Sequence, residues 1–135
     1  GNKLHYIFSQ IGSGKDVERI INQLEFDGVI QSAEKPALMS GIQRVLASEK
    51  GKKWFAPGLQ LYNECSIIFR NEGKIVTKRP DRVIKEGNHM TVIDFKFGKP
   101  SDNYIEQINL YVQLLKQMGY EAEGHLWYLD EYFPK

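Results

Sequence analysis

Apolar side chains near the start of the chain recur every three or four positions, which is the spacing of amphipathic helices. The pattern predicts three helices, over residues 3–11, 15–26 and 36–50. The third begins at Pro36, a residue that fits the first turn of a helix. Lysines, glycines and a proline then interrupt the pattern over residues 50–58, where we expect a turn.

From residue 59 onward the apolar positions alternate with polar ones, as they do in strands. Short turn sequences separate the first three predicted strands, which favours an antiparallel meander. The clearest helix follows, with Ser101 or Asp102 as its cap and Gly119 at its end. The predicted strands cover residues 59–69, 75–84, 90–97 and 121–129, and the helix covers residues 101–119.

These elements predict an α/β (α+β) fold in which helices flank a mixed four-stranded sheet. Three of its strands form the antiparallel meander, and the order of elements is αααβββαβ. A chain of 135 residues suits one domain, which we place at residues 1–135. The chain begins with glycine rather than methionine, and we expect it to be a piece of a larger protein.

The charged residues nearly balance, with 18 basic and 17 acidic side chains. This balance argues against a histone-like or polybasic nucleic-acid binder, although lysines can still gather in a local groove. The single cysteine, Cys65, excludes an internal disulfide and a cysteine-rich zinc site, and it indicates a reducing compartment such as the cytoplasm. Since no apolar run has membrane-spanning length, we expect no membrane partner.

Asp81 and Asp94 interrupt the apolar runs of two neighbouring predicted strands, and Lys96 follows two positions after the second aspartate. Because side chains alternate along a strand, Asp94 and Lys96 point to the same face, and the meander can place Asp81 beside them. Two close carboxylates repel each other, and a divalent cation such as Mg²⁺ relieves that repulsion. The alternative is two exposed aspartates at strand ends and a surface lysine.

Four segments resemble, in order, the motifs of the PD-(D/E)XK nuclease superfamily. They are GNKLHYIFSQI, RPDRVI, VIDFKFG and YIEQINLYVQLL. The resemblance is greatest to the RecB-like nuclease domains at the ends of UvrD-type helicase–nucleases, and it covers nearly the whole chain. It implies a restriction-endonuclease-like core and a domain excised from a larger helicase–nuclease. Arg79 and Pro80 depart from the family pattern, in which a glycine commonly precedes the first aspartate.

The resemblance also implies a function: hydrolysis of DNA phosphodiester bonds with Mg²⁺ or Mn²⁺, as an exonuclease in repair or recombination. DNA, as single strands or ends, and the helicase domains of the same parent are the implied partners. The implied catalytic residues are Asp81, Asp94, Lys96, Gln107 and Tyr111. The implied metal ligands are His5, Asp81, Asp94 and the carbonyl of Phe95, with Glu64 and Tyr104 near them.

Each further candidate has a plainer alternative. His5 can be a packed or capping residue, Glu64 an exposed position on a strand, and Gln107 and Tyr111 part of a helix packed on the sheet. The segment IGSGKD resembles a phosphate-binding loop, but Ser9 stands where that loop needs a glycine and Asp16 where it needs Ser or Thr. We interpret it as a turn between two helices.

Lys52, Lys53 and Trp54 combine cations with an aromatic ring, as single-stranded DNA tracks do. The alternative is a solvated turn whose aromatic side chains are packed inside. Two other functions also remain open. One is a nuclease-like module that binds DNA or a helicase partner without cleaving, and the other is an interaction domain that binds no metal.

Overall fold

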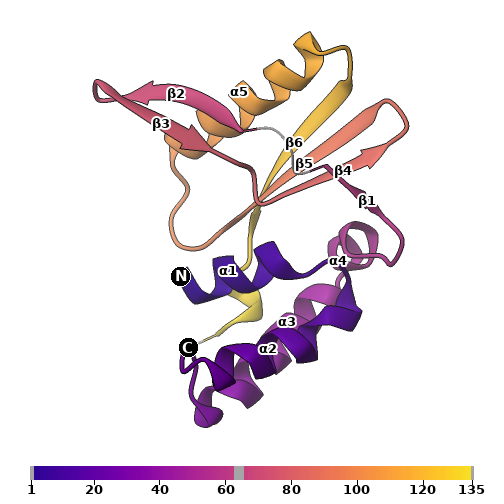
Figure 1. The fold of residues 1–135 in the computed structure, drawn as a ribbon, viewed down its shortest axis with the longest axis vertical. Helices are drawn as coiled ribbons and strands as arrows, with labels where there is room; N and C mark the ends of the chain where they lie inside the picture. Colours follow the sequence, from indigo (N-terminus) through magenta and orange to yellow (C-terminus); the bar gives the residue numbers. More distant parts are fainter. Residues whose placement is uncertain (1, 63–65, 135) are drawn as a thin grey trace. The chain divides into compact units, whose positions relative to one another are not determined.

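The computed structural model describes residues 2–62 and 66–134, and it divides the chain into two compact units. The helical unit comprises Gly1–Gly58 and Tyr128–Lys135, and the sheet unit comprises Leu59–Trp127. Figure 1 shows α1 to α4 in the helical unit, and α5 with the strands in the sheet unit.

The helical unit is built from amphipathic helices whose apolar stripes face a common core. The buried face of α2 consists of Val17, Ile20, Ile21 and Leu24. Phe8 of α1 contacts the rings of Phe55 and Phe133, with ring centroids 6.1 and 6.2 Å away, so the end of the chain packs back onto the first helix. The helices are α1 (Asn2–Gln10), α2 (Val17–Phe26), α3 (Lys35–Ala47) and α4 (Glu49–Trp54), with short 3-10 turns at Gly14–Asp16, Ser32–Glu34 and Asp130–Tyr132.

The predicted turn over residues 50–58 is wrong in its first half, because Glu49–Trp54 forms α4. Ser48 caps this helix by accepting a hydrogen bond from the N–H of Gly51 at 3.1 Å. Gly51 is buried, and a side chain there would collide with the carbonyl oxygen of Val45 in α3. The glycine therefore allows the two helices to approach closely rather than breaking the helix.

The sheet unit contains a four-stranded sheet in the order β1-β4-β5-β6. β1 pairs with β4, and β4 pairs with β5, both antiparallel. The N–H of Glu121 donates to the carbonyl of Asn88 at 2.9 Å, so β5 and β6 begin side by side and run parallel. Helix α5 is the crossover connection between these two strands. The elements are β1 (Gln60–Leu61), β4 (Arg82–Glu86), β5 (His89–Lys96), α5 (Asp102–Gln117) and β6 (Glu121–Tyr128).

The predicted meander of three successive long strands is wrong. The first predicted strand is divided into β1 and β2 (Ile67–Asn71), and the second is divided into β3 (Lys74–Lys78) and β4. Pro80 lies at the second division, where it lacks the N–H that a continuous ladder needs. The element order αααβββαβ is therefore also wrong, while a mixed α and β fold with a four-stranded sheet is confirmed.

β2 and β3 pair only with each other, as a separate two-stranded sheet among the described residues. Their turn contains Glu72 and Gly73 with φ angles of 53° and 78°. Two consecutive positive φ angles are typical of the type I′ turn, whose twist matches that of the strands it joins. The three antiparallel strands of the main sheet are thus β1, β4 and β5, with this hairpin inserted between β1 and β4 in the sequence.

Helix α5 covers one face of the main sheet and forms the core of the sheet unit. Gly124 of β6 lies directly under the helix, since a side chain there would meet Ile108 at 2.9 Å and Val112 at 3.0 Å. Ser101 caps α5, as predicted, by accepting a hydrogen bond from Asn103 N–H. The buried residues of this core are Val83, Met90, Val92, Ile108, Tyr111, Val112 and Leu115.

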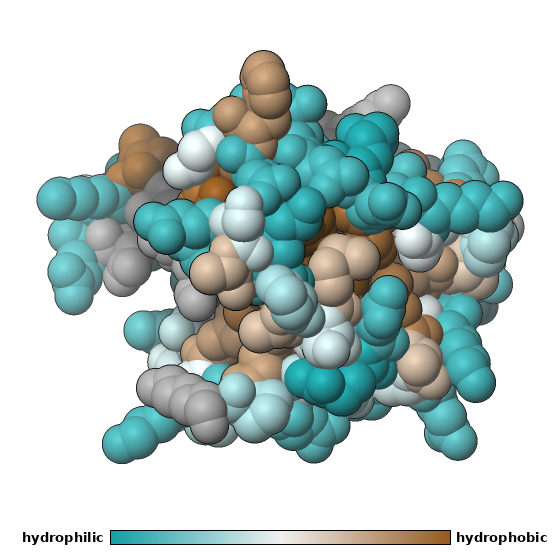
Figure 2. All heavy atoms as spheres, turned by 90° about the horizontal axis from the view of Figure 1, so that it is seen from below, coloured by the Kyte–Doolittle hydropathy of each residue, from teal (hydrophilic) through white to brown (hydrophobic). Residues whose placement is uncertain are grey.

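The face shown in Figure 2 is mainly hydrophilic, with smaller areas of apolar atoms between the charged side chains. Scattered exposed apolar residues, such as Phe26 and Val29, are common on protein surfaces and need no partner to explain them. None of the helices in the described ranges has the length and hydropathy that crossing a membrane requires.

Candidate active site

Asp81, in the bend immediately before β4, lies beside Asp94 of β5. The register pairs Val83 with Val92 and Arg82 with Ile93, so its next step places Asp81 opposite Asp94. The N–H of Asp81 donates to Oδ1 of Asp94, and the N–H of Phe95 donates to Oδ2 of Asp81, both at 2.9 Å. These two reciprocal hydrogen bonds fix the orientation of both carboxylates and hold them together where β4 begins.

Both aspartates belong to the sheet face that α5 covers. Met90, Val92, Asp94 and Lys96 alternate along β5 and therefore share one face, and Val83 shares it on β4. The apolar members of this set pack under α5. Phe95 points to the other face, where its ring lies 6.0 Å from that of Trp127. The acidic pair is thus an extension of the apolar core.

Lys96 is held under the first turn of α5. Its Nζ lies 4.2 Å from the ring centroid of Tyr104, a cation–π contact. Only 7% of Lys96 and 3% of Asp94 are exposed. A lysine this buried loses rotamer freedom and hydration, and the Tyr104 ring and the nearby carboxylates offset that loss. The contact with Tyr104 gives the ammonium group a defined position on the sheet face that Asp94 shares.

The two other predicted residues on α5 differ in burial. Gln107 follows Tyr104 by one helical turn and is half-buried. Tyr111 is 1% exposed and lies within the core cluster. Packing accounts for Tyr111, and its catalytic role stays a prediction. Gln107, one turn nearer the acidic pair, is the better placed of the two to reach a bound ligand.

The site combines the buried Asp94 and Lys96 with the half-buried Asp81. Burial disfavours charged groups, and two neighbouring carboxylates add mutual repulsion. Mg²⁺ takes one or two carboxylates, with waters and phosphate oxygens completing an octahedron, so the pair fits this ion or Mn²⁺. A group of three His, Cys, Asp or Glu side chains that could hold a metal is not found in the described part of the chain.

Arg82 follows Asp81 and points to the opposite face of the sheet, since it pairs with Ile93. It is 3% exposed. Burial lowers the pKa of its guanidinium to about 10, which leaves the group charged at pH 7. The cation of Arg82 therefore belongs to the other face of the sheet from the acidic pair.

The remaining predicted residues lie elsewhere. His5 is half-buried on α1 in the helical unit, and its role as a ligand stays a prediction. Glu64 lies outside the described residues. Lys52 and Lys53 are exposed on α4, whereas Trp54 is buried beneath Lys50, so its ring offers no open surface for a stacked base.

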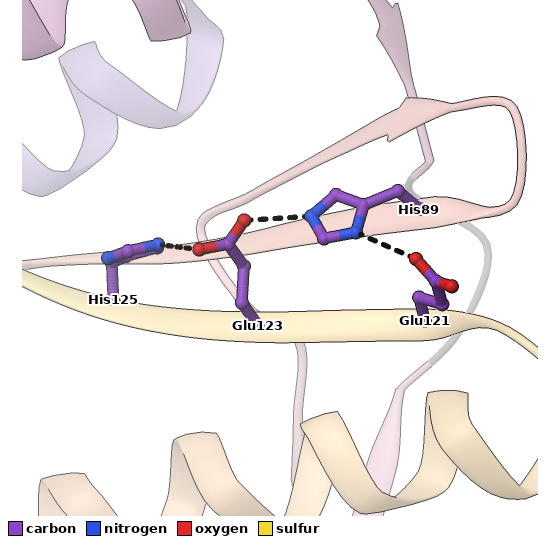
Figure 3. A network of polar contacts seen from close by, with 4 residues as sticks. All are labelled: His89, Glu121, Glu123 and His125. Carbon is purple, nitrogen blue, oxygen red and sulfur yellow. Dashed lines mark hydrogen bonds and ion pairs between the residues drawn. The ribbon is translucent and has the colours of Figure 1, made fainter.

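The structure also shows a polar network that the motifs do not predict. His89 begins β5, and its Nε2 lies 2.7 Å from Oε1 of Glu123, while Nε2 of His125 lies 2.8 Å from Oε2 (Figure 3). Glu121 approaches the second ring nitrogen of His89 at 3.8 Å. The hydrogen bonds from both histidines lower the pKa of Glu123. The alternation EAEGH, which places these β6 residues on one face, is the signal that could have found the network.

No protein-family model matches this chain, and no curated protein matches it at a significant level.

Proposed function

We propose that this chain is a metal-dependent deoxyribonuclease domain with a restriction-endonuclease-like core, of the PD-(D/E)XK superfamily. The observation that carries the proposal is the pairing of Asp81 with Asp94 through reciprocal 2.9 Å hydrogen bonds, with Lys96 on the same face. Two of these charged groups, Asp94 and Lys96, are buried, and buried charges are costly to keep. A phosphodiester with a divalent cation supplies charges that complement all three.

Each residue of the site has a role that follows from its position. Asp81 and Asp94 would hold the cation, together with the carbonyl of Phe95. When bound, such a cation polarises the phosphate and acidifies a water molecule. Lys96 lies near two carboxylates, which favour its charged form, so it stabilises negative charge on the phosphate rather than accepting a proton.

Tyr104 is a positioning residue, because its ring fixes the ammonium of Lys96. Gln107, on the next turn of the same helix, would orient the DNA or Lys96, and the same role is proposed for Tyr111. The resemblance to RecB-like domains further supports exonucleolytic action on single strands or ends, in repair or recombination, next to the helicase domains of a parent protein.

The test is cleavage of end-labelled DNA with Mg²⁺ or Mn²⁺, with and without chelator. We expect chelator-sensitive cleavage by the wild type and its loss in Asp94→Ala and in Lys96→Ala. Lys85→Ala is a matched control, because Lys85 also lies over a ring, that of Tyr120 at 5.5 Å, near the opposite end of β4 from Asp81. Cleavage that persists in Asp94→Ala or Lys96→Ala contradicts the proposal. DNA binding without cleavage by the wild type favours the non-catalytic alternative.

A further inference from the structure

Two segments that the acidic site does not use come together in the helical unit. They are the loop IGSGKD and the lysine-rich helix α4, which are more than thirty residues apart in the sequence. Together they line a pocket of about 340 Å³. This volume falls within the range of small-molecule sites. The lining residues are Gly14, Lys15, Leu46, Gly51, Lys52, Phe55, Ala56 and Pro57.

The pocket has apolar walls and a basic rim. Leu46, Phe55 and Pro57 form much of the wall, and the two charged lining residues, Lys15 and Lys52, are both exposed. Within the described ranges neither lysine forms an ion pair, whereas Lys35 of the same unit pairs with a glutamate. Two positive charges at one small pocket, with no carboxylate among the lining residues, create a site for an anion.

The carboxylate of the loop, that of Asp16, bonds to its own backbone and pairs with Arg19 at 3.7 Å. It accepts hydrogen bonds from the N–H groups of Gly12 and Ser13, at 2.9 and 3.1 Å. These bonds lower the pKa of Asp16 and hold the loop closed. Lys15 of this loop is therefore exposed, while the carboxylate of Asp16 accepts hydrogen bonds from the loop's own backbone.

We propose that this pocket binds one nucleotide of a single DNA strand. The phosphate would lie between Lys15 and Lys52, and the base would pack against the accessible apolar part of the wall, which is Leu46, Ala56 and Pro57 because Phe55 is only 3% exposed. A base in a duplex is stacked and paired, so it cannot enter a pocket. The choice of DNA rests on the proposed function, while the ligand class, an anion with an apolar face, rests on the pocket alone.

The experiment measures binding of a fluorescent oligothymidine by anisotropy, in chelator so that no cleavage occurs. The double variant Lys15→Gln, Lys52→Gln should bind about tenfold more weakly, and its log–log salt slope should be shallower by about 0.7, since the two lysines contact one phosphate and each neutralised phosphate on a single strand contributes about 0.7. Lys116→Gln is the control: Lys116 is also an exposed lysine on a helix, near the end of α5, and it does not line the pocket. It should change the affinity by less than about twofold.

Gly14→Leu tests the apolar part of the pocket separately. An added Cβ at Gly14 meets only Leu46 Cδ1, at an ordinary 3.6 Å, so a side chain can begin at this pocket-lining position without a collision of its Cβ. We expect weaker binding with an unchanged salt slope, and competition by free thymidine monophosphate in the wild type only. Equal losses in Lys52→Gln and Lys116→Gln, or wild-type binding by Gly14→Leu, overturn the proposal.

The two proposals fail in distinguishable ways. Asp94→Ala lies outside the pocket and should abolish cleavage while binding is retained. If the wild type cleaves DNA and the pocket variants bind like the control, the pocket proposal alone is wrong. If the pocket variants lose binding and the wild type never cleaves, the nuclease proposal alone is wrong.

Discussion

Replacing Asp94 by asparagine should stabilise the metal-free protein. Side chains opposite each other on antiparallel strands lie about 5 Å apart, and two unit charges at that distance repel by about 3 kcal/mol at an effective dielectric constant of about 20. Lys96, about 7 Å along the same strand, attracts Asp94 by about 2 kcal/mol, which the variant also loses. Asparagine keeps an oxygen for the Asp81 N–H. The net gain is about 1 kcal/mol of unfolding free energy.

The same substitution should remove the response to metal. A cation at 100 times its dissociation constant adds about 2.7 kcal/mol to the stability of the protein that binds it. Asp94→Asn should gain less than about 1 kcal/mol under the same conditions, since one of two carboxylate ligands is gone. The order of the two unfolding free energies should therefore reverse between the two buffers. The variant should be the more stable protein in chelator, and the wild type the more stable one in Mn²⁺.

Urea unfolding followed by circular dichroism, in EDTA and then in Mn²⁺, measures both effects. Glu86→Gln is the control, because it removes one negative charge from the exposed end of β4 and leaves the acidic pair intact. Its stability should stay within about 0.5 kcal/mol of the wild type in both buffers. A loss of stability by Asp94→Asn in EDTA, or an equal gain from Mn²⁺ in both proteins, would refute the reasoning.

Three further outcomes are expected. Tyr104→Leu removes the ring that holds Lys96 and should lower kcat about tenfold with little change in KM. Tyr104→Phe retains a ring and should keep the wild-type rate. Equal rates in both variants would show that Tyr104 does not position Lys96 for cleavage. Leu115→Ala opens a cavity under α5 and should lower the unfolding free energy by about 2–5 kcal/mol in urea, and a smaller loss would mean that the core closes around it. Hydrogen bonds lower the pKa of Glu123 below the ordinary 4.5, so its stabilising effect is present above pH 4.5 and is lost as the pH falls through the lowered pKa. The melting-temperature difference between the wild type and Glu123→Gln should therefore shrink from about pH 7 to about pH 3. A constant difference would contradict this prediction.

The sequence predicts those parts of the fold that depend on local periodicity. Helix α5 follows from its apolar spacing and from Ser101, which caps it as expected. The approach of Asp81 to Asp94 also follows from the sequence, because a short turn joins their strands and fixes the pairing within a residue. The part of the site on β4 and β5 was therefore predictable.

Features that depend on partners distant in the sequence were not predictable. The residues around Pro80 continue a strand-like alternation, and only the separate pairing of β2 with β3 shows that the strand ends before Asp81. Gly51 looks like a helix breaker in the sequence, but its contact with α3 requires a glycine within a helix. The burial of Tyr111 and the pocket beside Lys15 likewise result from packing between elements.

The most direct test of the account is an anomalous difference map from a crystal soaked in Mn²⁺. We predict a peak between the carboxylates of Asp81 and Asp94, at about 2.0–2.3 Å from an oxygen of each. Carboxylates that are turned apart, with no peak between them at saturating Mn²⁺, would contradict the proposed metal site and the nuclease function that depends on it.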